Sequence, residues 1–248
     1  MAAQMRDFGE VAIAAPATEQ SGVGHSITFR TPLIAQSVHR DGRHWAWAVE
    51  GSPADCTKLA VAELCKDSPI ELVVSGINSG LNAGINVLYS GTVAAAVEGA
   101  FFGLTSIAVS LEFDEDADYE AAAAIAYPMI TRIAGDADCR GGLFNINIAT
   151  ETCRRYRRGE PIEHAVCPMG QVQYGRSFEK RTDPDGNPYY WSTSSPPEAE
   201  PSGEVDLSQV FEGKVTLTPL QFDLTHPDRL KQLRTWKFAS PKVSADGT

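Results

Sequence analysis

The alternation of short apolar runs with helix-forming stretches constrains the fold of this chain more than any other feature. Runs rich in branched residues predict buried strands at 10–15, 71–75, 106–111 and 143–148. Helices are predicted at about 52–66, at 92–103 and at 117–134, the last bent or broken near Pro128. We therefore expect an α/β protein with a Rossmann-like, mostly parallel sheet and helices on both faces.

The character of the sequence changes at about Cys167. The runs 171–178, 183–191 and 213–220 are short, extended and separated by turn residues, which predicts hairpins. A Pro-rich segment at 194–204 predicts a solvated loop, and a last short helix is expected at roughly 227–237. We expect a core domain at 1–166 and, at 167–248, a hairpin arm and helix used in contacts between subunits.

The net charge and the cysteine content indicate which binding partners and which cellular compartment to expect. The formal net charge of −11 argues against binding to a nucleic acid duplex or to an anionic membrane. No apolar run is long enough to span a bilayer, and the N-terminus lacks the apolar core of a signal peptide. Five scattered cysteines without C-x-x-C spacing indicate reduced thiols, so we expect a cytoplasmic protein.

The stretch 73–99, VVSGINSGLNAGINVLYSGTVAAAVEG, carries the clearest chemical signal. It predicts a strand, a loop dense in Gly and Asn, and a helix that starts at Ser90-Gly91-Thr92. The free N–H groups and the dipole of a helix start favour an anion such as phosphate, and Asn78 and Asn82 add side-chain amides. In the alternative interpretation, Gly and Asn only form tight turns and Ser90 only caps the helix.

The order SGIN-x-G-x-N-x-G followed by YSGT-x-AA-x-EG resembles the signature of the SurE survival-protein family of 5'- and 3'-nucleotidases. Other segments resemble the family in the same order: 11–28, 51–56, 106–111, 144–147, 185–191 and 215–225. The resemblance implies a metal-dependent phosphomonoesterase that hydrolyses nucleoside monophosphates. It also implies assembly into homodimers or homotetramers.

The resemblance further implies a divalent cation of the Mg or Mn class held by two adjacent aspartates, a serine and an asparagine. By motif position these last two are Ser21 and Asn78, while Asn82, Ser90, Gly91 and Thr92 would line the phosphate pocket. The family pattern begins with a strand that ends in Asn-Asp-Asp-Gly, and no segment here matches it. We therefore expect that this first strand and its acidic pair are missing, that no catalytic residue can be assigned, and that the chain as written is nearly inactive.

Three alternatives stay open. The acidic run 112–116 could replace the missing pair, although a solvated loop or helix start, where acids are favoured, explains it better. The chain could be a degenerate family member that binds anions or oligomerises without catalysis. A dinucleotide-binding protein is disfavoured because GINSGLNAG lacks the spacing G-x-G-x-x-G. Among the histidines, only His25 is expected near the pocket.

Overall fold

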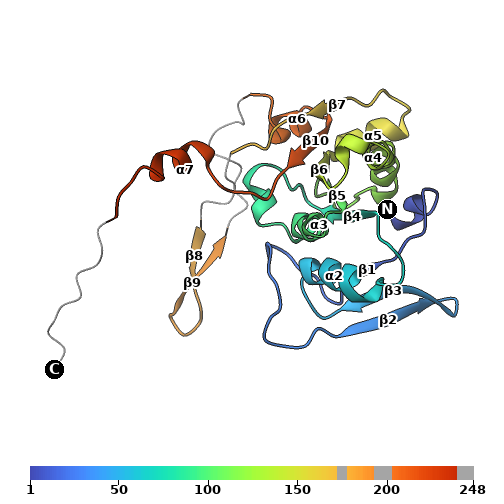
Figure 1. Cartoon of the computed structure of the whole chain (residues 1–248), viewed down its shortest axis with the longest axis horizontal. Helices are drawn as coiled ribbons and strands as arrows, with labels where there is room; N and C mark the ends of the chain where they lie inside the picture. The colour runs from blue at the N-terminus through green and yellow to red at the C-terminus, as the bar shows by residue number, and fades with distance from the viewer. Residues whose placement is uncertain (172–177, 193–202, 239–248) are drawn as a thin grey trace.

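The computed structural model describes residues 1–171, 178–192 and 203–238. Figure 1 shows a layered α/β body from which a hairpin and a C-terminal helix project. The elements, in chain order, are α1 (Ala2–Met5), β1 (Ala14–Pro16), β2 (Ala35–Arg40), β3 (Arg43–Val49), α2 (Pro53–Leu59), η1 (Ala60–Leu64), β4 (Leu72–Ser79), η2 (Gly84–Leu88), α3 (Gly91–Phe101), β5 (Thr105–Leu111), α4 (Tyr119–Ala134), η3 (Ala137–Cys139), β6 (Leu143–Ile148), α5 (Thr150–Arg157), β7 (His164–Val166), β8 (Phe178–Thr182), β9 (Pro188–Ser192), α6 (Asp206–Phe211), β10 (Val215–Leu220) and α7 (Pro227–Leu233).

The main sheet has five strands in the order β4-β5-β6-β10-β7. The pairs β4–β5, β5–β6 and β10–β7 are parallel, and β10 runs antiparallel to β6. The predicted strands at 71–75, 106–111 and 143–148 are its first three members. The sheet is thus mixed and largely parallel.

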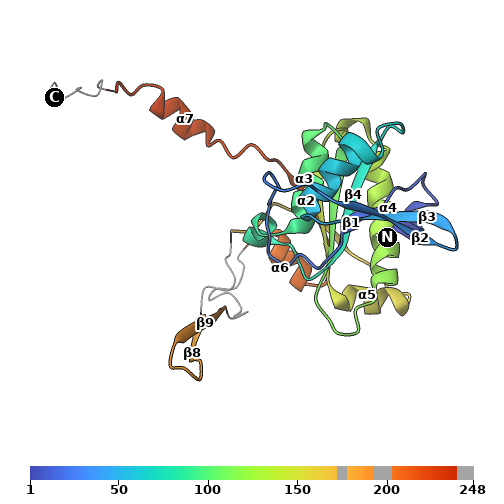
Figure 2. The ribbon, with the colours of Figure 1, turned by 90° about the horizontal axis from the view of Figure 1, so that it is seen from below.

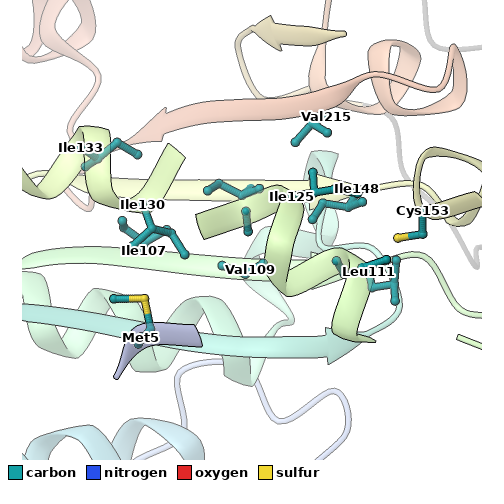
Figure 3. Close-up of a cluster of buried hydrophobic side chains, with 14 residues drawn as sticks. Met5, Ile107, Val109, Leu111, Ile125, Ile130, Ile133, Ile148, Cys153 and Val215 are labelled. Atoms are coloured by element: carbon teal, nitrogen blue, oxygen red, sulfur yellow. The ribbon is translucent and has the colours of Figure 1, made fainter. Parts of the chain in front are cut away.

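Side chains of β5 show how helices come to cover both faces of this sheet. Ile107, Val109 and Leu111 join a buried cluster with α4, drawn in Figure 3, whereas Ala108 packs with Val93 of α3. Successive side chains of a strand point to opposite faces. Helices α3 and α4 therefore lie on opposite faces, as Figure 2 also shows.

A second sheet, of three strands in the order β1-β3-β2, was not expected as a separate unit. Strand β1 pairs parallel with β3, and β2 and β3 form a hairpin whose turn is Asp41-Gly42, both at positive φ. The run 10–15 was predicted as a buried strand, but β1 spans three residues and is only half-buried. The expectation of a buried strand is wrong here, because β1 belongs to the small three-stranded sheet and not to the interior of the main sheet.

The expected boundary at 166/167 does not separate core from arm. Strand β10, expected to form a hairpin of the arm, inserts between β6 and β7 of the main sheet. Helix α6, which directly precedes β10 in the chain, also packs into the core, since Leu207 and Val210 are fully buried. After residue 203 the chain returns to the core, where β10 pairs with strands that are distant in sequence. Local sequence patterns cannot reveal such a pairing.

The helices begin close to where the sequence predicts. Helix α2 starts with a capping box, in which the Ser52 side chain accepts from the Asp55 N–H and the Asp55 carboxylate accepts from the Ser52 N–H. Helix α4 continues through Pro128 to Ala134, so the expected break does not occur. Helix α5, which lies over the acidic loop after β5, was not predicted.

The arm consists of the β8–β9 hairpin and α7 as far as the structure describes it. Every residue of β8 and β9 is exposed, and α7 contains no buried residue. A final helix is present where it was predicted, and so is a hairpin, but its strands are 178–182 and 188–192, and residues 183–187, predicted to be extended, form its turn. The Pro-rich segment at 194–204 and the run at 171–178 lie mostly outside the described residues.

Within residues 1–171, 178–192 and 203–238, no helix is both long and apolar enough to cross a membrane.

Candidate active site

An open cleft of about 460 Å³ lies where β1 and β4 end. Its wall is formed by the end of β1 and the loop that follows, by the end of β4, and by the starts of α2 and α3. The lining residues are Pro16, Ala17, Thr18, Glu19, Gln20, Ser21, Pro53, Gly76, Ile77, Asn78, Ser79 and Thr92. Ligands of α/β proteins bind beyond the carboxyl ends of the strands, and this cleft occupies that position.

The loop after β1 brings Ser21 to the cleft. Its hydroxyl donates a hydrogen bond to Glu19 Oε1 at 2.9 Å. Farther along the loop, the Gly24 N–H donates to the Tyr89 carbonyl at 2.9 Å, which ties the loop to the segment before α3. A side chain at Gly24 would be strained, because its φ is +55° and a Cβ would lie 3.2 Å from the Leu88 carbonyl oxygen.

Asn78 and Thr92 meet at the opposite wall. The Thr92 hydroxyl donates to Asn78 Oδ1 at 3.1 Å, and Asn78 Nδ2 donates to the Gly80 carbonyl at 2.8 Å. These bonds fix the amide so that its oxygen faces the start of α3. Gly76 lets β4 approach β5 here, because a Cβ on it would lie 2.3 Å from the Val109 carbonyl oxygen.

Ser90 and Gly91 contribute to the helix start rather than to the cleft wall. The Ser90 side chain accepts from the Val93 N–H at 3.1 Å, so the capping interpretation holds for this residue. Gly91 faces α2, because a Cβ on it would lie 2.8 Å from Pro53 Cγ and 3.2 Å from Val23 Cγ2. In the described residues, the N–H groups of Gly91 and Thr92 have no hydrogen-bond partner, so they remain as donors for an anion.

Asn82 was expected to line the phosphate pocket, but its placement does not support that role. The residue is 7% exposed, and its side-chain amide donates to Ser110 Oγ at 2.7 Å. Its backbone N–H donates to Asn147 Oδ1 at 2.8 Å, and its carbonyl accepts from Asn145 Nδ2 at 2.7 Å. Asn82 therefore anchors the loop after β4 to β5 and β6.

The acidic run after β5 makes contacts with α5 and does not belong to the cleft lining. Glu112 accepts from the Thr150 N–H at the start of α5, and Asp114 pairs with Arg154 at 2.9 Å. Nearby Asp118 caps α4, and its hydrogen bonds with Arg157 lower its pKa to about 2. In the described part of the chain, no three His, Cys, Asp or Glu side chains gather as a metal site.

His25 does not line the cleft. Its Nε2 lies 2.6 Å from Oε1 of the buried Glu98 on α3, and its ring stacks on Phe101. This pair holds the end of the Ser21 loop against α3.

The five cysteines are unpaired, and burial raises the pKa of Cys56 to about 12 and that of Cys153 to about 11, which keeps both thiols protonated.

The oxygens that line the cleft suit a hard divalent cation. Ser21 Oγ, Asn78 Oδ1 and the Glu19 carboxylate are all oxygen donors, and the lining includes no thiol or imidazole. Glu19 was missed by the sequence analysis. Its position two residues before Ser21 was the available signal, but a side-chain bond between such neighbours depends on how the loop folds.

Comparison with known proteins points to one family. The family profile described as "Survival protein SurE" matches residues 1–176. A protein of Rhodopirellula baltica named "5'-nucleotidase SurE" is 59% identical over 233 residues, which cover 94% of this chain and 90% of that protein. A protein of the same name from Heliobacterium modesticaldum is 36% identical, with 97% and 86% covered.

A solved structure gives the same assignment. The crystal structure of the SurE protein from Aquifex aeolicus superposes with a TM-score of 0.79 at 31% identity, and covers 94% of this chain and 91% of that one. The chain belongs to the SurE family. The coverage of the relatives gives no support to the expectation that the family's first strand and acidic pair are missing.

Proposed function

We propose that this chain is a phosphomonoesterase, a 5'-nucleotidase that also accepts nucleoside 3'-monophosphates and uses a divalent cation of the Mg or Mn class. One observation carries the proposal: Ser21, Asn78 and Thr92, far apart in sequence, line one cleft at the ends of β1 and β4. The 59% identity to a protein named 5'-nucleotidase SurE supports it.

In this proposal each group has a distinct task. Ser21 Oγ and Asn78 Oδ1 would hold the cation, which when bound would neutralise charge on the phosphate. The N–H groups of Gly91 and Thr92 receive phosphate oxygens at the start of α3. Ser90 caps that helix, and Asn82 keeps the loop before it in place. The P–O bond to the nucleoside breaks as water oxygen bonds to phosphorus, and a proton released by that water ends on the leaving oxygen. No residue of the cleft is assigned as nucleophile or base.

The function is tested by phosphate release from nucleoside 5'- and 3'-monophosphates with Mn²⁺, and with EDTA in place of the metal. We expect metal-dependent release that falls at least about 100-fold in Asn78→Ala, since several kcal/mol of charge stabilisation are lost. Gln36→Ala, which removes an exposed amide on β2, is the control and should keep full activity. A well-folded chain that binds Mn²⁺ or phosphate without hydrolysis would support the non-catalytic alternative.

Assembly and location complete the proposal. The described part of the arm exposes Tyr189, Tyr190 and Trp191 on β9, and Leu230 and Leu233 on α7. Aromatic and aliphatic surface of this kind is characteristic of subunit contacts. We propose a homodimer or homotetramer built through the arm. The unpaired cysteines fit the reducing conditions of the cytoplasm.

A further inference from the structure

Glu19 is the one carboxylate among the residues that line the cleft. Its Oε1 accepts the hydroxyl proton of Ser21 at 2.9 Å. A serine hydroxyl has one proton and two lone pairs. Because the Ser21 O–H donates its hydrogen bond to Glu19, the lone pairs of Ser21 Oγ remain available to another partner. A cation binds through such lone pairs.

The fold does not depend on Glu19. The residue is exposed, and it pairs with no Lys, Arg or His side chain in the described part of the chain. Other contacts fix the loop: the Gly24 N–H bonds to the Tyr89 carbonyl, Ser52 Oγ donates to the Ser26 carbonyl, and Thr28 donates to Asp55. A carboxylate at a cleft wall that only orients a neighbouring hydroxyl is better explained by binding than by stability.

Charge points the same way. Ser21 and Asn78 are neutral ligands, and a hard divalent cation usually needs at least one carboxylate nearby. Groups that hydrogen-bond to metal ligands orient them and raise their donor strength. Glu19 can do both, because its negative charge also strengthens its hydrogen bond to Ser21.

We propose that Glu19 is a positioning residue for the cation: it accepts the Ser21 proton and so directs the Ser21 oxygen toward the metal. The proposal rests on the function proposed above. It adds a residue that acts on the cation through Ser21, without touching the reacting phosphate.

The test measures binding of Mn²⁺ to the full chain by calorimetry, together with the Mn²⁺ concentration that half-activates hydrolysis. Glu19→Ala removes both the acceptor and the charge, and we expect Mn²⁺ binding to weaken about 10- to 100-fold. Glu19→Gln keeps an acceptor oxygen and should lose less. Glu63→Gln, an exposed carboxylate on η1 outside the cleft, should bind Mn²⁺ as the unmodified chain does. Saturating Mn²⁺ should restore most of the kcat of Glu19→Ala.

A double-mutant cycle decides whether Glu19 acts through Ser21. If it does, Glu19→Ala should have little further effect on Mn²⁺ binding in a Ser21→Ala background. Equal effects in both backgrounds, or Mn²⁺ binding by Glu19→Ala within twofold of the unmodified chain, would overturn the proposal. Hydrolysis that survives in that case leaves the proposed function standing. An unmodified chain that binds no Mn²⁺ overturns both, and one that binds Mn²⁺ without hydrolysis overturns only the function.

Discussion

Asp55 shows at the scale of one residue how the cleft is built. Its carboxylate is 1% exposed and accepts from the Thr28 N–H at 3.0 Å, the Thr28 hydroxyl at 2.7 Å and the Ser52 N–H at 3.0 Å. Burial raises the pKa of this group, but the hydrogen bonds from Thr28 and Ser52 outweigh burial, so the pKa lies below 3.8. One carboxylate thus joins the Ser21 loop to the start of α2.

Asp55→Asn should therefore destabilise the protein by about 1–3 kcal/mol at pH 7, because its amide NH₂ would face N–H or O–H donors. A lowered folded-state pKa gives stability that is present above the unfolded value, 3.8, and is lost as pH falls through the folded value. The difference between the two proteins in free energy of unfolding should then shrink below pH 4. Urea unfolding at pH 7, 4 and 3 measures it, with exposed Asp67→Asn as control. An equal difference at all three pH values would contradict the assignment.

At the scale of elements, the start of α3 depends on its contact with α2. Gly91 leaves no space for a side chain, since a Cβ would meet Pro53 at 2.8 Å and Val23 at 3.2 Å. A larger residue would push apart two helices that both line the cleft. A loss of anion binding on substituting Gly91 would thus report helix packing, so Thr92 and Asn78 are the better probes of the site.

Gly91→Ala should lower the free energy of unfolding by about 1–3 kcal/mol, the usual cost of overpacking. Gly9→Ala is the matched control, because nothing lies within 4 Å of a Cβ there and its φ is not positive. Denaturant titration of both variants provides the measurement. Equal stability of the two variants would show that α2 can shift without cost.

For the whole molecule, the arm is the part that the core does not explain. The β8–β9 hairpin pairs only with itself among the described residues, yet it exposes Tyr190 and Trp191 by 59% and 58%. A two-stranded hairpin alone is marginally stable in water. A partner surface that buries these rings would supply the missing stability.

Light scattering at micromolar concentration should therefore give at least twice the chain mass of 26.7 kDa. Changing Tyr190 and Trp191 together to Ser should shift the protein toward the monomer, because large aromatic side chains dominate interface energies. Changing exposed Lys180 and Arg181 of the opposite strand to Ser should have a smaller effect. A monomer at all concentrations for the unmodified chain would exclude assembly through the arm.

Local signals in the sequence determined much of the core and part of the site. Branched apolar runs located β4, β5 and β6, since burial of such runs hardly depends on their partners. Ser52 and Ser90 marked the starts of α2 and α3, because a cap acts within one turn. The β2–β3 hairpin had a readable signal in Asp41-Gly42 that was overlooked. The motif spacing, through its resemblance to the SurE family, singled out Ser21, Asn78 and Thr92.

The tertiary structure alone decided what depends on contacts between distant residues. It placed β10 between β6 and β7, divided the strands into two sheets, and turned Asn82 away from the cleft into bonds with Ser110, Asn145 and Asn147. It also brought the Glu19 carboxylate to the Ser21 hydroxyl inside the cleft. Helix propensity, caps and turns depend on interactions over a few residues. Strand order and side-chain direction depend instead on the free energy of the whole folded chain.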